Sequence, residues 1–247
     1  HLVLYGHGLL GSNDEIDANF DMRSDANGRD PDESSKTLRR YHQLLWSKPL
    51  PSGALFELST ATPSVYQHHM SELGQFWLSS DTVIRTFRGV LRMDPIISQI
   101  PEAEREEFSR LRYTIGAMMV FPGNRIDGKW TINQARGMSP KLEDRFDLTL
   151  ECIRRHYIGE DSPLSDVLER YAEFFALFDD FRGFVDFFLL QDLVTDDNSG
   201  IRFFAPFNNF VSSPFPQSVG EYERYRALTI DFVTARNERI RGYASTL

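Results

Sequence analysis

The stretch "SPKLEDRFDLTLECIRRHY" (residues 139–157) carries the clearest structural signal in the chain. Its apolar side chains recur every three or four residues, which is the spacing that places them on one face of a helix. Glu151 and Arg155, four residues apart, form a favourable pair on such a helix. The stretch therefore predicts an amphipathic helix packed on a core. The residues of its apolar face are Leu142, Phe146, Thr149, Leu150, Ile153 and Tyr157.

Strand patterns precede this helix. "YTIGAMMVFP" (113–122) is typical of a buried strand because it is apolar and carries β-branched residues. The Asp-Gly pair in "NRIDGKWTI" (124–132) is a strong turn signal, so we expect a hairpin into a second strand. Further short strands are expected in "ALFELS" (54–59) and "YQHHMSELGQFWLSS" (66–80), and helices in "SSKTLRRYHQLLWS" (34–47) and "PEAEREEFSRLRY" (101–113).

The C-terminal half reads as mainly helical. "RGFVDFFLLQDLV" (182–194) is apolar nearly all round, which predicts a buried central helix or strand, and "IRFFAPF" (201–207) predicts a strand. Ser218 and Glu221 have the spacing of a capping box at the start of the last helix. We expect an α+β fold, a helix-rich single domain over residues 17–247 with a small antiparallel sheet. Residues 1–16 would be an N-terminal extension or an edge strand.

Composition limits the classes of function. The 247 residues include a single cysteine, Cys152, so an internal disulfide is excluded and a cytoplasmic location is favoured. The chain lacks the long apolar run of a membrane-spanning helix. Its net charge of −9 disfavours generic binding to duplex DNA. Charge is segregated, however, because residues 13–35 hold eight acidic residues and two arginines, whereas residues 36–48 hold four cations and no acid. Such a basic patch can hold one phosphate group.

The N-terminal stretch "LVLYGHGLLGS" (2–12) resembles an oxyanion-hole strand and turn of α/β-hydrolases. That family also needs a Gly-x-Ser-x-Gly elbow and a late histidine. The chain has no such elbow, and its last histidine is His156. We therefore reject hydrolase activity of this type.

The sequence also argues against common metal and cofactor sites. The acidic turn that ends near Gly28 fails the EF-hand pattern because Arg23 stands where the first ligand is needed. His68 and His69 are adjacent and would point to opposite faces of a strand. Neither a phosphate-binding Walker loop nor a dinucleotide-binding Gly-x-Gly-x-x-Gly motif occurs. We expect no metal site and no cofactor.

The best candidate for a ligand site is "NQARG" (133–137) with the helix that follows it. An arginine offers a two-pronged donor to phosphate or carboxylate, and backbone N–H groups at a helix start favour anions. The alternative is that these arginines pair with the many acidic side chains and brace the scaffold. The ligand-binding candidates are Arg136, Asn133, Gln134, Arg145, Arg40 and Lys48, and the candidates for a catalytic role are His42 and His156.

Four phrases resemble an uncharacterised family of bacterial and phage-associated proteins, known as a domain of unknown function. They are "LRRYHQLLWSKPLPSG" (38–53), "DGKWTINQARG" (127–137), "DRFDLTLECIRRHY" (144–157) and "RGFVDFFLLQDLV" (182–194). The resemblance covers about residues 17–243. It implies no activity, cofactor or catalytic residue.

Two functions of different class remain open. In the first, the protein is an intracellular enzyme or sensor that binds a phosphate-bearing ligand, such as a nucleotide or a nucleic-acid end. Arg136, Arg145 and His156 would then meet Arg40, His42 and Lys48 in one pocket. In the second, it is a non-catalytic protein that binds another protein, in a phage-related or defence context.

Overall fold

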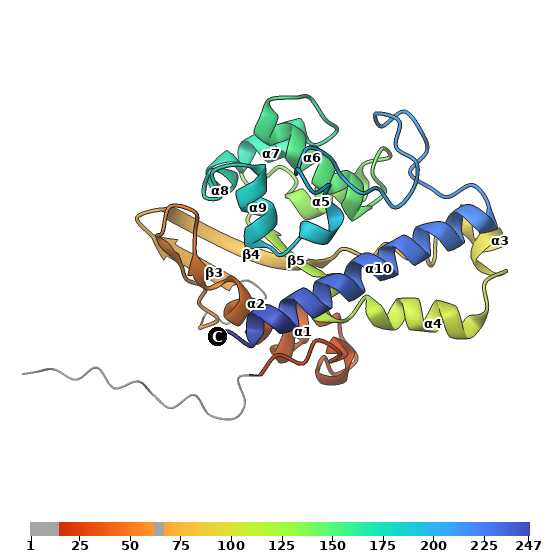
Figure 1. Cartoon of the computed structure of the whole chain (residues 1–247), viewed down its shortest axis with the longest axis horizontal. Helices are drawn as coiled ribbons and strands as arrows, with labels where there is room; N and C mark the ends of the chain where they lie inside the picture. The colour runs from red at the N-terminus through yellow and green to blue at the C-terminus, as the bar shows by residue number, and fades with distance from the viewer. Residues whose placement is uncertain (1–14, 62–66) are drawn as a thin grey trace, which may run out of the picture.

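The computed structural model describes residues 15–61 and 67–247. Its centre is an antiparallel sheet with the strand order β3-β4-β5 (Figure 1), and a smaller antiparallel pair, β1-β2, forms a second sheet that contacts β3 through Phe56 and His69. Gln67 pairs with Leu78 in the β3-β4 hairpin, and Leu78 also faces Pro122 of β5. The strands are β1 (Lys48–Pro49), β2 (Leu55–Phe56), β3 (Gln67–Ser71), β4 (Gly74–Thr82) and β5 (Met118–Pro122).

Helices cover this sheet. In Figure 1, α5 to α9 gather on one side of it, while α1, α2 and the long α10 lie toward the other. In chain order the helices are α1 (Pro31–Ser34), α2 (Lys36–Trp46), α3 (Asp94–Ile97), α4 (Glu102–Leu111), α5 (Ile132–Met138), α6 (Phe146–Ile158), α7 (Ser165–Arg170), α8 (Ala172–Ala176), α9 (Phe181–Phe187) and α10 (Val219–Ala244). The 3-10 turns are η1 (Met22–Asp25), η2 (Leu91–Met93), η3 (Ile115–Ala117) and η4 (Gln191–Leu193). The expected helix-rich α+β fold with a small antiparallel sheet is confirmed.

Polar side chains of α10 fasten that helix to the sheet. Arg236 is fully buried and donates to the backbone carbonyls of Gly116, Met118 and Phe188. Asn237 accepts a hydrogen bond from the Gly116 backbone N–H at 2.7 Å. A Cβ at Gly116 would collide with the Asn237 side chain, so only glycine permits this approach. Long-range hydrogen bonds therefore set the position of α10.

Two expected strands are absent from the described structure. Asp127 and Gly128 form a turn with positive φ angles, but the chain then enters α5 rather than a second strand. Thr131 caps α5 because its hydroxyl accepts from the N–H of Gln134, and the Gln134 side chain accepts from the N–H of Thr131. In residues 201–207 only Ile201 forms a bridge, to Val194. A turn signal marks a reversal and leaves open which element follows it.

The helix predicted over 139–157 starts later than expected. Residues 139–145 form turns, and Glu143 and Asp144 have φ angles of 47° and 64°, which a helix does not allow. At the last helix, Ser218 caps the N–H of Glu221 as predicted. The Glu221 carboxylate, however, accepts from the N–H of Gln217 instead of closing the box on Ser218. The predicted N-terminal extension falls mostly in residues 1–14, outside the described residues.

A cleft between α1, α2, β4 and α5 as the candidate functional site

A directed chain of hydrogen bonds crosses from α2 to α1 through β4. His42 and Trp46, four residues apart on α2, are both fully buried. The indole Nε1 of Trp46 donates to His42 Nδ1 at 2.9 Å. An indole can only donate, so Nδ1 is the accepting nitrogen and His42 Nε2 carries the proton. That Nε2 lies 2.9 Å from Ser80 Oγ, and the Ser80 hydroxyl donates to Asp32 Oδ1 at 3.4 Å.

This chain limits what His42 can do. Burial lowers the pKa of His42 to about 3, and the positive charge of Arg236 adds to the effect, so the imidazole is neutral at physiological pH. Since its proton is on Nε2 and points to Ser80, His42 cannot take a proton from that hydroxyl. His42 and Ser80 therefore do not form a nucleophile and base pair. They orient the carboxyl group of Asp32 instead.

Asp32 is the titratable group at the end of the chain. It lies in α1, where Asp30 caps the helix by accepting from the Asp32 backbone N–H at 3.1 Å. Removal from water raises the pKa of Asp32 to about 7, and the negative charges of Asp81 and Asp30 act in the same direction. Asp32 can thus hold or release a proton near neutral pH, as a general acid or base must.

Arg136 and Asp81 form one wall behind Asp32. Arg136 is fully buried on α5, and its Nη1 donates to Asp81 Oδ2 at 2.9 Å. Its Nε donates to Thr149 Oγ1 and its Nη2 to the Asp144 carbonyl. Burial raises the pKa of Asp81 to about 6, although the charge of Arg136 opposes that shift. The guanidinium is enclosed by protein, so Arg136 braces the wall from behind and does not offer its donors to a ligand.

Asp32 and Asp81 border a cavity of about 540 Å³, which we call the acidic cavity. The predicted residues Asn133 and Gln134 both line it. The Asn133 amide donates to Ser79 Oγ at 3.2 Å, while its Oδ1 is buried without a partner among the described residues. The lining residues are Asp30, Asp32, Glu33, Ser79, Ser80, Asp81, Gly123, Asn124, Arg125, Thr131, Asn133 and Gln134.

Two further hollows adjoin the acidic cavity. A narrow one of about 100 Å³, here called the neck, shares Asp32, Glu33 and Ser80 with the acidic cavity, and it also contacts His42 and Gln67. The neck shares Lys36 and Arg39 with an open hollow of about 700 Å³, the cationic groove, which Arg40 also lines. Together the three hollows form a cleft in which acidic side chains predominate at one end, where Arg125 is the cation, and cations predominate at the other, where Glu57 is the acid.

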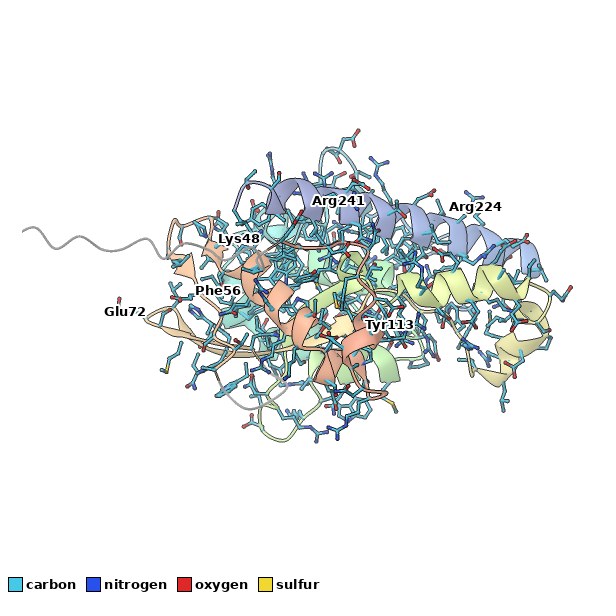
Figure 2. The ribbon with its side chains drawn as sticks, turned by 90° about the horizontal axis from the view of Figure 1, so that it is seen from below. Lys48, Phe56, Glu72, Tyr113, Arg224 and Arg241 are labelled. Atoms are coloured by element: carbon cyan, nitrogen blue, oxygen red, sulfur yellow. The ribbon has the colours of Figure 1, made fainter. Side chains whose placement is uncertain are left out.

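The other predicted site residues lie elsewhere. Arg145 is buried and makes a two-pronged pair with Asp147, with Nη2 to Oδ2 at 2.5 Å. Lys48 lies near the C-terminal end of α10 (Figure 2), with its ammonium 4.6 Å from the ring centre of Tyr243. Burial lowers the pKa of Lys48 to about 8. His156 packs against Phe175, 5.3 Å between ring centres. The described residues therefore do not gather the predicted cations in one pocket.

Cys152, the only cysteine of the chain, is buried. Burial raises the pKa of its thiol to about 12, so it is not an activated nucleophile.

Within residues 15–61 and 67–247, no group of three or more His, Cys, Asp or Glu side chains is arranged to hold a metal ion. In the same ranges, none of the helices combines the length and the apolar character needed to cross a bilayer.

Comparison with known proteins gives one match. A family model described as a family of unknown function (DUF6994) covers residues 16–240. The chain belongs to DUF6994. No curated protein and no solved structure matches it. The DUF6994 match agrees with the resemblance seen over about residues 17–243, and it includes every residue of the cleft described above except Leu247 at the edge of the cationic groove.

Sequence reasoning had not assigned a site role to Asp32, Ser80, Asp81 or Gln67. Asp32 was visible only as part of the acidic segment 13–35. Ser80 and Asp81 lie near the C-terminal end of β4, a strand whose sequence shows no site motif. No local pattern could have paired them, because Asp32 and Ser80 are 48 residues apart and Asp81 and Arg136 are 55 apart.

Proposed function

We propose that the protein is an enzyme that acts on a phosphate-bearing small molecule by proton transfer to or from Asp32. The observation that carries the proposal is the position of Asp32, which borders both the neck and the acidic cavity at the end of an oriented hydrogen-bond chain. A carboxyl group with a pKa of about 7 is well suited to act as an acid or a base at neutral pH. His42 and Ser80 are positioning residues in this proposal.

The cationic groove supports the phosphate part of the proposal. Arg39 and Arg40 lie three and four residues after Lys36 at the start of α2, which places the three on one side of the helix, and all three line the groove. Lysine and arginine are the side chains that bind phosphate oxygens most effectively. Because Lys36 and Arg39 also border the neck, a phosphate held there places the rest of the ligand next to Asp32. A nucleotide or a nucleic-acid end has this arrangement of groups, and we propose the cytoplasm as its setting.

Turnover is the direct test of the enzyme. Nucleoside monophosphates and sugar phosphates are incubated with the protein, and product formation is followed by phosphorus and proton NMR. We expect turnover of at least one compound and a loss of about 100-fold or more in Asp32→Asn, the scale of general acid–base catalysis. The wild-type rate should change with a midpoint near pH 7, the pKa of Asp32. Turnover that survives in Asp32→Asn would refute the catalytic role.

Binding tests the groove separately. Lys36→Glu reverses one charge of the groove and should abolish the stabilisation that inorganic phosphate gives in a thermal unfolding assay. Arg224→Glu is the matched control. Arg224 is exposed, does not line the groove and lies on the N-terminal half of α10, away from Arg241 and Lys48 (Figure 2). An equal loss of stabilisation in both variants would show that only net charge matters. No stabilisation of the wild type by phosphate would refute the groove.

The non-catalytic alternative has a different basis. The β3-β4 hairpin exposes Met70 by 72% and Leu73 by 38%, and β3 is an edge strand. Exposed apolar side chains on a strand edge are a feature of protein-binding surfaces. Under this alternative Asp32→Asn leaves function intact, whereas a charged residue at Met70 removes it.

A further inference from the structure

Gln67 holds an oxygen that nothing in the described part of the chain satisfies. It is the first residue of β3, only 2% exposed, and its side chain lines the neck beside Asp32 and Ser80. Its Oε1 is buried without a hydrogen-bond partner among the described residues. A buried carbonyl oxygen without a donor is costly, and most such oxygens in folded proteins are paired.

Asn133 holds a second oxygen of this kind, in the adjoining acidic cavity. Its Nδ2 donates to Ser79 Oγ, which leaves Oδ1 as the unpaired atom. Asp32 borders the hollows of both residues. The two unpaired atoms are therefore both acceptors, and they belong to residues that line the two hollows that share Asp32.

The surroundings of Asp32 offer acceptors and negative charge. The Ser80 hydroxyl donates a hydrogen bond to Asp32, and the His42 Nε2 proton is directed to Ser80, so neither is free to donate to a ligand. Asp30, Glu33 and Asp81 add carboxylates at the acidic end. The cations Lys36 and Arg39 also line the neck. The neck thus presents both signs of charge within one small hollow.

We infer that the ligand carries a primary amino group a few bonds from its phosphate, and that the ammonium binds between Asp32 and Gln67 Oε1. This inference rests on the proposed function for the phosphate, and adds the chemistry of the group at the other end. An ammonium group supplies the three donors that the acceptors around Asp32 lack. A metal ion is the less suitable cation, because the described residues hold no group of three or more His, Cys, Asp or Glu side chains that could ligate it.

The test compares two probes that differ only in this group, 2-aminoethyl phosphate and 2-hydroxyethyl phosphate. Isothermal titration calorimetry should show that the amino probe binds at least about tenfold more tightly, since a charge-assisted hydrogen bond replaces a neutral one. Gln67→Leu should weaken the amino probe by about tenfold and leave the hydroxyl probe nearly unchanged. The same variant should unfold at a higher temperature without ligand, because it removes a buried unpaired oxygen.

Gln75→Leu is the matched control for Gln67→Leu. Gln75 is exposed on the far end of β4 and does not line the cleft. It should change neither affinity nor the preference for the amino probe. A purely structural role for Gln67 would instead lower the unfolding temperature and weaken both probes equally.

The outcomes separate this inference from the proposed function. If the two probes bind equally and Lys36→Glu abolishes both, the inferred amino group is refuted and the proposed phosphate site in the groove is supported. Tight binding of the hydroxyl probe only when magnesium is added would also overturn it, because the cation would then be a metal. Binding of ethanolamine without phosphate, lost in Gln67→Leu, would support the ammonium site and refute the groove. Failure of every probe to bind would overturn both.

Discussion

Arg145 at the start of α6 and Asp32 in the neck bury charge in opposite ways. Arg145 and Asp147 form a two-pronged pair, and the same carboxylate accepts from the backbone N–H of Phe204 at 2.9 Å. Asp32 accepts one hydrogen bond from the Ser80 hydroxyl, and the negative charges of Asp30 and Asp81 disfavour its ionised form. The comparison teaches that a buried charge with a complete set of partners is scaffold, whereas a carboxyl group with an altered pKa beside a cavity is a candidate site.

Arg145→Met should have the largest effect on stability. The change leaves the Asp147 carboxylate buried without its cation and should cost about 3–5 kcal/mol in the free energy of unfolding. Urea unfolding followed by circular dichroism measures it. Arg241→Met is the control, because Arg241 and Glu238 form an exposed pair that contributes less than about 1 kcal/mol. Similar losses of stability in the two variants would show that the enclosed Arg145–Asp147 pair contributes no more than an exposed pair.

Arg136→Lys should have the next largest effect on stability. Lysine keeps the charge but cannot reach Asp81, Thr149 and the Asp144 carbonyl together. We expect a loss of about 2–3 kcal/mol in the free energy of unfolding, through unpaired buried acceptors. Binding of inorganic phosphate should stay at the wild-type level, because Arg136 is enclosed. Weaker phosphate binding at unchanged stability would return Arg136 to the ligand site.

Asp32→Asn should stabilise the protein at high pH. The folded-state pKa of Asp32, about 7, is above its ordinary value of 3.8, so the protonated group favours folding below about pH 4. That contribution is lost as the pH rises through about 7, because the ionised carboxylate is poorly solvated and is repelled by Asp81 and Asp30, while the charge of Arg112 offsets part of the cost. Because an asparagine at this position cannot ionise, the variant avoids this loss, and its free energy of unfolding at pH 8 should exceed that of the wild type by about 1–3 kcal/mol. Stability curves of both proteins between pH 4 and 8 check it, and parallel curves would contradict it.

Thr131→Ala should have the smallest effect of the four. It removes the cap of α5 on the wall of the acidic cavity and should cost about 1 kcal/mol, the usual value for such a cap. Because Asn133 and Gln134 follow directly, binding of the amino probe should weaken as well. A thermal unfolding assay with and without 2-aminoethyl phosphate measures both. Ser218→Ala, which removes the cap of α10 far from the cleft, should cost similar stability with no effect on binding.

Parts of the fold that depend on local pattern could be predicted. The apolar face of α6, the cap at Ser218 and the buried strand β5 all follow from neighbours within a few residues. The expected strand after Asp127 was wrong because a turn fixes only the reversal of the chain. The strand expected over 201–207 was wrong because strand formation needs a partner strand, and Ile201 has a single bridge to Val194.

The candidate site was predicted only in part. Asn133 and Gln134 line the acidic cavity, and Arg40 lines the cationic groove. Arg136 and Arg145 were expected beside them, but both are enclosed in ion pairs. Local sequence identifies an arginine near a helix start. It cannot say whether an acid from a distant strand will reach that arginine first.

By itself, the sequence determined where the charge lies along the chain and which faces of the helices are apolar. The change from acidic to basic residues near position 35 is the same change that makes the cleft acidic at one end and cationic at the other. Only the tertiary structure decided that Asp32 would be removed from water beside Ser80 and Asp81. Desolvation is the largest cause of the raised pKa of Asp32, and it depends on atoms brought together from distant parts of the chain, so the sequence around Asp32 does not reveal it.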